Sequence, residues 1–212
     1  MPNHELIARR DLSPSAYVLR IERGEMQFTP GQYITVGAAG DVESREYSVY
    51  SGAGDPYLEV LIKEVSGGSV SRRLRRLPSG SPLAVEGPFG FFTVAAEHAR
   101  GPVLFVASGT GIAPFRAMVR SDPALDYLLL HGVRTLDDCY ETEAYAADRY
   151  VPCVSRGSGG YRGHVTDYLR EHPVAASTPC FLCGNSAMIF AAFDLLKRQG
   201  VPSEHLFAEV YF

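Results

Sequence analysis

Two short sequences in the first half of the chain contain residue types that bind phosphates and planar rings. In Arg45-Glu46-Tyr47-Ser48 the arginine and the tyrosine are two positions apart, so their side chains would share one face of a strand. A guanidinium grips a phosphate through two hydrogen bonds, a phenol lies against a ring, and a hydroxyl donates to a ring nitrogen. Gly67-Gly68-Ser69-Val70-Ser71 stands at a predicted helix start, where backbone N–H groups and the helix dipole attract anions. The alternatives are an ordinary strand surface and a flexible turn with Ser69 as the helix cap.

Two glycine turns in the second half follow apolar segments and precede helical ones. Residues 107–115 read Ala-Ser-Gly-Thr-Gly-Ile-Ala-Pro-Phe, and residues 183–188 read Cys-Gly-Asn-Ser-Ala-Met. Glycine lets the backbone approach a ligand, proline favours the first turn of a helix, and a helix N-terminus attracts a pyrophosphate. Open α/β sheets bind ligands at such carboxyl ends of their strands. Cys180 and Cys183 are not expected to form a redox pair or a metal site, and a buried core position is an alternative for Cys183.

Two different hydrophobic periodicities predict two domains around these motifs. Short aromatic and β-branched runs separated by Gly, Pro and Asp predict an antiparallel β-barrel or sandwich for residues 1–98. Longer apolar runs that alternate with helical stretches predict an α/β domain with a mainly parallel sheet for residues 99–212. The predicted strands are 17–21, 32–36, 47–50, 57–62, 103–107, 127–131 and 180–183, and the predicted helices are 70–77, 114–120, 161–171 and 186–199.

The composition of the chain argues against several classes of protein. Its 212 residues are 46% hydrophobic and 21% charged, as in ordinary globular proteins rather than disordered ones. A net charge of −4 argues against nucleic acid as the main partner, because phosphate binding requires a basic surface. No membrane insertion and no secretory signal are expected. The four cysteines do not make a disulfide framework, so a cytoplasmic location is predicted.

The order of these motifs and the barrel-then-α/β arrangement resemble the ferredoxin–NADP reductase family over essentially the whole chain. Arg-x-Tyr-Ser resembles the flavin motif of that family, Gly-Thr-Gly-Ile-Ala-Pro-Phe its nucleotide pyrophosphate loop, and Cys-Gly-Asn-x-x-Met its nicotinamide-side strand. The tail Ala208-Glu209-Val210-Tyr211-Phe212 is similar to the acidic-then-aromatic C-terminus of the family. The resemblance implies an FAD-binding β-barrel domain at 1–98 and an NADP(H)-binding α/β domain at 99–212, with a tail that returns to the flavin.

The resemblance also implies a role for individual residues. Arg45 would bind the flavin pyrophosphate, Tyr47 would pack on the isoalloxazine, and Ser48 would hydrogen-bond flavin N5. Tyr211 would stack on the ring face that nicotinamide enters. The implied catalytic residues are Ser48, Cys183, Glu209 and Tyr211, and no metal site is implied. The implied cofactor-binding residues are Arg45, Tyr47, Ser48, Lys63, Gly68, Val70, Ser71, Thr110, Gly111, Pro114, Arg134, Ser155, Arg156, Arg162, Gly184, Asn185, Met188, Tyr211 and Phe212.

Cations near the adenine ribose would select NADP over NAD. Ser155 and Arg156 are the strongest candidates, because a hydroxyl and a guanidinium together suit a phosphate dianion. Surface ion pairs with carboxylates are the alternative for Arg134 and Arg162. The resemblance implies FAD as the bound cofactor, and the short chain leaves FMN as an alternative.

The resemblance implies ferredoxin or flavodoxin as the electron carrier. An acidic carrier of this kind could be steered by the basic run of Arg72, Arg73, Arg75 and Arg76. A solvated helix face is the alternative for this run. The expected protein is a monomeric oxidoreductase that transfers hydride between NADP(H) and FAD and single electrons to or from the carrier. The reductase component of an oxygenase, a free-flavin reductase and a non-catalytic flavin- or nucleotide-binding sensor are the alternatives.

Overall fold

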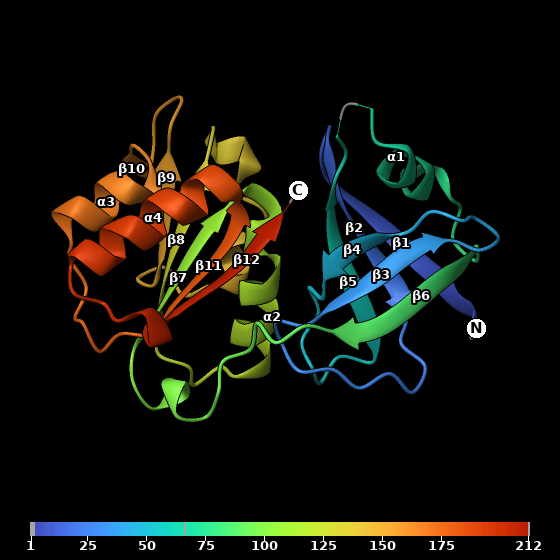
Figure 1. Cartoon of the computed structure of the whole chain (residues 1–212). Coiled ribbons are helices and arrows are strands. Elements are labelled where there is room, and N and C mark those ends of the chain that lie inside the picture. Colours follow the sequence, from blue (N-terminus) through green and yellow to red (C-terminus); the bar gives the residue numbers. More distant parts are fainter. Residues whose placement is uncertain (1–2, 66, 212) are drawn as a thin grey trace. The chain divides into compact units, whose positions relative to one another are not determined.

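The computed structural model of the chain describes residues 3–65 and 67–211 (Figure 1). The chain forms two compact units. The first contains the described residues up to Thr93 together with Ala113–Ser121, and the second contains Val94–Ile112 and the described residues from Asp122 onward. The segment 113–121 therefore belongs to the first unit although it lies in the second half of the sequence.

The first unit is built on a six-stranded antiparallel sheet that closes on itself. Its strands are β1 (Asn3–Ser13), β2 (Ala16–Glu22), β3 (Tyr33–Ala38), β4 (Arg45–Ser48), β5 (Tyr57–Lys63) and β6 (Pro82–Phe89), in the order β4-β3-β6-β1-β2-β5. Just after β4, Val49 forms a bridge with Val60 of β5, and the Tyr50 amide donates to the Glu59 carbonyl oxygen at 2.7 Å. These bonds join the two edge strands into the predicted barrel.

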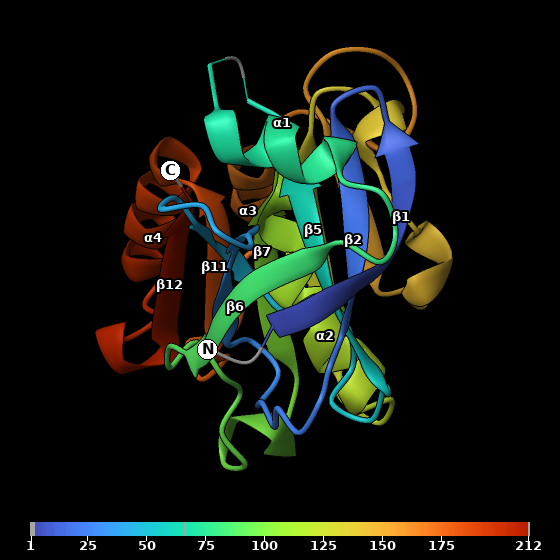
Figure 2. The ribbon, with the colours of Figure 1, turned by 90° about the vertical axis from the view of Figure 1, so that its right-hand side faces the viewer.

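Helix α1 (Ser69–Arg76) lies over one end of this barrel (Figures 1 and 2). Val70 and Leu74 are buried from one face of α1 into the barrel core, whose members include Leu19, Ile34 and Val60. The helix begins after Gly68 as its N-cap, so the prediction that Ser69 caps it is wrong. Ser69 is instead the first helical residue, because Gly68 already has the extended backbone of a cap.

Helix α2 (Ala113–Ser121) is bound to the barrel by charged side chains. Arg116 donates to the Tyr50 carbonyl oxygen at 2.9 Å and forms an ion pair with Glu59 at 3.4 Å. Arg120 forms two hydrogen bonds with Asp55, at 2.6 and 2.7 Å. Asp55 and Glu59 of the barrel are therefore both paired with arginines from α2, which lies much later in the sequence.

The second unit is built on a parallel sheet. Its strands are β7 (Val103–Ser108), β8 (Tyr127–Val133), β9 (Tyr150–Val154), β10 (Tyr161–Arg162), β11 (Cys180–Asn185) and β12 (Leu206–Tyr211), in the order β10-β9-β8-β7-β11-β12. Helices α3 (Val165–Glu171) and α4 (Ser186–Arg198) cover one face of the sheet (Figure 1). The order reverses at β7, so the carboxyl ends of β7, β8 and β11 meet at a switch point where open sheets bind ligands.

One predicted helix is shorter than its sequence pattern indicated. Tyr161 and Arg162 do not begin the helix predicted at 161–171 but pair as strand β10 with Cys153 and Val154 of β9. The helix begins at Val165, where His164 and Asp167 form a capping box. None of the helices in the described part of the chain has the length and apolar character that a bilayer crossing requires.

Candidate functional site

Strand β4 places the Arg-x-Tyr-Ser residues along one edge of the barrel sheet. Arg45 is exposed and donates to the Ser44 carbonyl oxygen at 2.7 Å. Tyr47 is half-buried against the barrel core, and this burial raises the pKa of its phenol to about 12. Ser48 is only 3% exposed and lies opposite Tyr33 of β3. The strand thus combines an exposed guanidinium with a neutral phenol that is held in place by packing.

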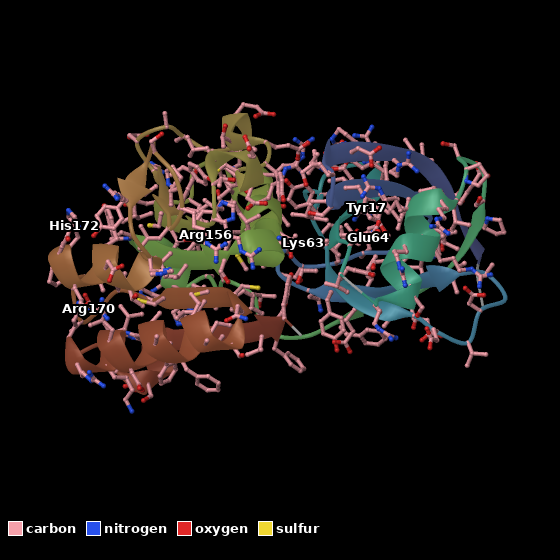
Figure 3. The ribbon with its side chains drawn as sticks, turned by 90° about the horizontal axis from the view of Figure 1, so that it is seen from above. Tyr17, Lys63, Glu64, Arg156, Arg170 and His172 are labelled. Carbon is pink, nitrogen blue, oxygen red and sulfur yellow. The ribbon has the colours of Figure 1, made fainter. Side chains whose placement is uncertain are left out.

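The first turn of α1 is shaped to receive an anion. No acidic residue and no side-chain cap occupy this turn, and the buried Ser71 hydroxyl has no hydrogen-bond partner in the described structure. A Cβ on Gly68 would lie 2.7 Å from Val65 and 3.1 Å from the Ser71 oxygen, so no side chain fits there. Tyr17 (Figure 3) donates to the Ser71 carbonyl oxygen and fixes the turn from inside the barrel. An unpartnered hydroxyl beside free helix amides fits a phosphate group.

Val70 and Lys63 contribute differently from Ser71. The Val70 side chain is 7% exposed and belongs to the barrel core, so only its backbone amide is available to a ligand. Lys63 ends β5 as an exposed side chain (Figure 3). The loop before β4 is tied to α1, since Ser69 donates to Glu43 at 2.5 Å and Arg73 pairs with Asp41 at 2.8 Å.

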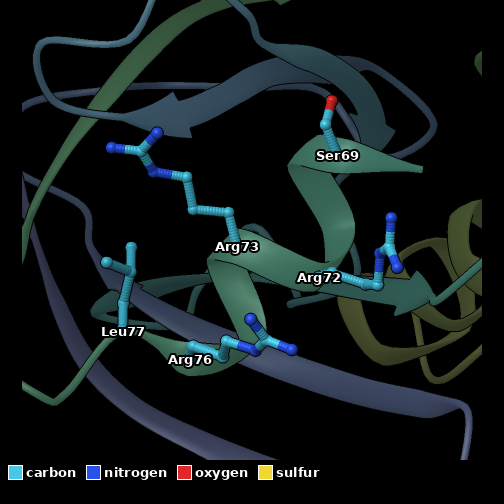
Figure 4. Close-up of a pocket in the computed structure, with 5 residues that line it drawn as sticks. All are labelled: Ser69, Arg72, Arg73, Arg76 and Leu77. Atoms are coloured by element: carbon cyan, nitrogen blue, oxygen red, sulfur yellow. The ribbon is translucent and has the colours of Figure 1, made fainter. Parts of the chain in front are cut away.

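The basic run on α1 divides into two groups. An open pocket of about 470 Å³ is lined by Ser69, Arg72, Arg73, Arg76 and Leu77 (Figure 4). Arg75 does not share it, because it pairs with Asp11 at 3.1 Å and with Glu64 at 3.4 Å on the barrel. Arg73 also lines the pocket but pairs with Asp41, so within the described chain Arg72 and Arg76 are the members of the run that line the pocket without an ion pair.

The two glycine turns of the second unit pack directly against each other. A Cβ on Gly111 would lie 2.3 Å from the Cys183 carbonyl oxygen, and one on Gly184 would lie 2.4 Å from the Ser108 hydroxyl. Ser108 also accepts a hydrogen bond from the Asn185 amide at 2.9 Å. The structure thus brings the loops after β7 and β11 together, and Ser108, which was not among the predicted site residues, joins them.

The remaining members of the two motifs have different surroundings. Thr110 is half-buried in the turn, and Pro114 is buried in α2. The Asn185 side chain caps α4 by accepting from the Ala187 amide at 3.0 Å. Met188 is partly buried and packs on the core between the sheet and α4.

Three of the four predicted catalytic residues meet at the ends of β11 and β12. Cys183 lies opposite Glu209, and Asn185 lies opposite Tyr211. Burial and the neighbouring Glu209 carboxylate raise the pKa of the Cys183 thiol well above its usual value, while a hydrogen bond with Tyr211 lowers it. Cys183 is therefore a neutral thiol at physiological pH rather than a thiolate. Phe212 lies outside the described residues.

The predicted phosphate-selecting residues also gather at one edge of this sheet. The Arg156 amide donates to the Arg134 carbonyl oxygen at 2.8 Å, and Arg162 lies opposite Val154, two residues before Arg156. Ser155 bonds to the Val133 carbonyl oxygen at 3.2 Å. All three guanidinium groups are exposed (Arg156 is labelled in Figure 3), and within the described chain none pairs with a carboxylate. The surface ion pairs that were the alternative for Arg134 and Arg162 are therefore not formed among the described residues.

Comparisons with known proteins agree with this arrangement. Residues 4–94 match the oxidoreductase FAD-binding domain family, and residues 105–193 match the oxidoreductase NAD-binding domain family. The chain is 33% identical to ferredoxin–NADP reductase B of Sorangium cellulosum, over 97% of this chain and 96% of that protein. It belongs to the ferredoxin–NADP reductase family.

More distant matches extend this family assignment. The chain is 32% identical to the reductase component of propane 2-monooxygenase from Mycolicibacterium smegmatis. The match covers 90% of this chain and 61% of that longer protein. A ferredoxin NADP+ reductase from Neisseria gonorrhoeae, solved with bound FAD and NADP, superposes with a TM-score of 0.88 at 19% identity, covering 100% of this chain and 98% of that one. This structural similarity shows that the two proteins have the same fold.

The family assignment confirms the main predictions made from the sequence. This member of the ferredoxin–NADP reductase family is an oxidoreductase enzyme with an FAD-binding part and a nicotinamide-nucleotide-binding part. The predicted barrel followed by a parallel α/β sheet is confirmed as well. The alternatives, which were the reductase component of an oxygenase, a free-flavin reductase and a non-catalytic sensor, are not favoured.

Proposed function

We propose that this protein transfers hydride between NADP(H) and bound FAD and exchanges single electrons with an acidic ferredoxin or flavodoxin. The cluster of Arg134, Arg156 and Arg162, three exposed cations without carboxylate partners in the described chain, carries the preference for a phosphorylated nucleotide. Four free cysteines support a cytoplasmic enzyme, and we expect it to be a monomer.

The residues of the first unit would hold the flavin. We assign the pyrophosphate to Arg45, to the Ser71 hydroxyl and to the amides that follow Gly68, with Lys63 nearby on the same barrel. Half-buried Tyr47 would lie on the isoalloxazine and Ser48 would bond its N5. FAD, when bound, supplies the conversion between two-electron hydride transfer and one-electron transfer. We propose that residues 1–98 bind FAD and that residues 99–212 bind NADP(H).

The residues of the second unit would position the nucleotide. Thr110 and Gly111 would receive its pyrophosphate, and Gly184, Asn185 and Met188 its nicotinamide side. Pro114, which directly follows this turn in the sequence, lies in the first unit and stays a candidate contact of the pyrophosphate. Cys183 and Glu209, which lie opposite each other, would stand beside the reacting carbon. Tyr211, two residues after Glu209 in β12, would cover the isoalloxazine ring in the resting enzyme and move away when nicotinamide enters. Phe212 follows Tyr211 in the sequence.

Replacing Arg45 by Ala is expected to weaken FAD retention. The exposed guanidinium donates to the carbonyl oxygen of the neighbouring Ser44, so its removal should destabilise the fold little. The pyrophosphate would lose a charge-assisted hydrogen bond. Such a bond is worth roughly 1.5–3 kcal/mol, which corresponds to a Kd raised by about one to two orders of magnitude. Flavin titration of the apoprotein measures it. An unchanged Kd would remove Arg45 from the site.

Replacing Arg156 by Ala is expected to raise the Michaelis constant for NADPH about tenfold or more and to leave that for NADH nearly unchanged. Only the phosphorylated nucleotide loses a charge-assisted contact, which is worth about 1.5–3 kcal/mol. Flavin bleaching by each nucleotide, followed by its absorbance, measures both constants. Equal effects on the two nucleotides would show that Arg156 is structural, and a wild-type preference for NADH would refute the proposed nucleotide.

A double change of Arg72 and Arg76 to Glu is expected to slow reduction of an acidic carrier and to reduce its dependence on salt. Exposed charges steer association within a Debye length of about 8–10 Å, and these two line the α1 pocket. The matched control is the double change Arg170→Glu on α3 (Figure 3) and Arg198→Glu on α4, two exposed arginines of the second unit, which alters the net charge by the same amount. Carrier kinetics that respond equally to both variants would indicate only an effect of net charge.

A further inference from the structure

The buried side chain of His131 contacts the loop to which we assign the nucleotide pyrophosphate. We propose that His131 is a positioning residue: it holds the Gly109 carbonyl oxygen and thereby orients the amides of the Gly-Thr-Gly turn toward the nucleotide. The proposal rests on the proposed function of that turn. His131 lies near the end of β8, and all of its partners belong to the second unit.

Both ring nitrogens of His131 have partners inside the protein. The side chain is 0% exposed, its Nε2 lies 2.9 Å from the Gly109 carbonyl oxygen, and its Nδ1 lies 2.8 Å from the Tyr150 hydroxyl. The Tyr150 ring is itself held by parallel stacking on Tyr145, with ring centroids 5.2 Å apart. The imidazole therefore has one orientation, and it cannot leave the carbonyl without breaking a buried network.

The chemistry of these partners determines the tautomer. A carbonyl oxygen only accepts, so Nε2 must carry the proton and donate it to Gly109. In the neutral ring Nδ1 then accepts from the Tyr150 hydroxyl. Burial lowers the pKa of His131 to about 4, so the ring is neutral at physiological pH. The result is a directed chain of two bonds, from Tyr150 to His131 and from His131 to the turn.

Holding this one carbonyl group orients the following amide. In a planar trans peptide the C=O and the next N–H point in opposite directions, so the Thr110 N–H points away from the histidine. Gly109 has a φ of +53°, and the turn continues to Gly111, which packs on the Cys183 carbonyl oxygen. The turn is thus held from two sides, at Gly109 by a side chain and at Gly111 by a backbone contact.

The test compares two substitutions that differ in one donor. His131→Leu removes the donor, whereas His131→Gln can place an amide N–H near the position of Nε2. We expect His131→Leu to raise the Michaelis constants for NADPH and NADH by the same factor, about tenfold, because both contain the pyrophosphate. The Kd of NADP+ from equilibrium titration should rise equally. Inhibition by 2′-AMP, which lacks a pyrophosphate, and the FAD content should not change, and His131→Gln should restore binding to within about threefold of wild type.

Several outcomes would overturn the proposal. Nucleotide binding by His131→Leu that equals wild type would do so, and so would a parallel loss of 2′-AMP binding and FAD, which indicates a structural role only. If His131→Leu does not fold, Tyr150→Phe removes the donor to Nδ1 and should weaken NADPH and NADH equally, by about threefold; no change there also refutes the proposal. A wild-type protein whose flavin NADPH does not bleach would refute the proposed function itself.

Discussion

Gly111→Ala is expected to lower the rate of flavin reduction by NADPH at least about a hundredfold while the protein keeps its FAD. A Cβ at this position would lie 2.3 Å from the Cys183 carbonyl oxygen, 2.6 Å from its carbon and 2.7 Å from the Gly184 Cα. These are backbone atoms of β11, a strand that pairs on both sides, so they cannot rotate away. The pyrophosphate turn must shift instead, and misplacement by about 1 Å costs on the order of a hundredfold in rate.

A glycine in the same unit provides the matched control. A Cβ on Gly101 would meet no atom within 4 Å, and its backbone is extended, so Gly101→Ala should behave as wild type. Stopped-flow absorbance measures flavin reduction, and the visible spectrum of the purified protein measures FAD content. Near-wild-type reduction by Gly111→Ala would show that the turn tolerates displacement. A loss of FAD in the same variant would show that the damage extends to the first unit.

Glu59→Ala is expected to destabilise the first unit by about 3–5 kcal/mol. The carboxylate is 1% exposed and pairs with Arg20 at 2.9 Å, Arg10 at 3.1 Å and Arg116 at 3.4 Å. Arg116 is itself only 9% exposed and lies over the Tyr50 ring at 4.1 Å. Without Glu59, the buried guanidinium of Arg116 loses the carboxylate that lies 3.4 Å away, and removing one partner of a buried ion pair costs several times as much as losing a surface pair.

An exposed carboxylate of the same unit is the control for this effect. Asp11 pairs with Arg9 and Arg75, and its side chain is 47% exposed, so Asp11→Ala should cost at most about 1 kcal/mol. Urea unfolding of the flavin-loaded protein, followed through flavin release, compares the two variants. Equal free energies of unfolding for Glu59→Ala and Asp11→Ala would contradict the prediction. They would show that the arginines around Glu59 do not need its negative charge.

The local sequence determined most of the chemistry and both kinds of sheet. The apolar run at 103–107 is a buried strand of the parallel sheet, and the glycine turn after it leads into α2, as predicted. These features depend on neighbouring residues: strand periodicity, the backbone freedom of glycine and the φ of proline act over a few positions. Motifs of this kind were sufficient to identify the family and the cofactor classes.

Contacts between distant residues were decided only by the tertiary structure. The Arg116–Tyr50 bond spans 66 positions and the Asn185–Ser108 bond spans 77, and nothing local to either partner predicts them. The same holds for Tyr161 and Arg162, which follow a helical pattern but pair with β9 because a strand edge is available there. His131 looked like one more residue of an apolar strand, and only folding places Gly109 and Tyr150 at its two nitrogens. Burial of a polar group requires a partner, and the chain supplies that partner from wherever the fold brings it.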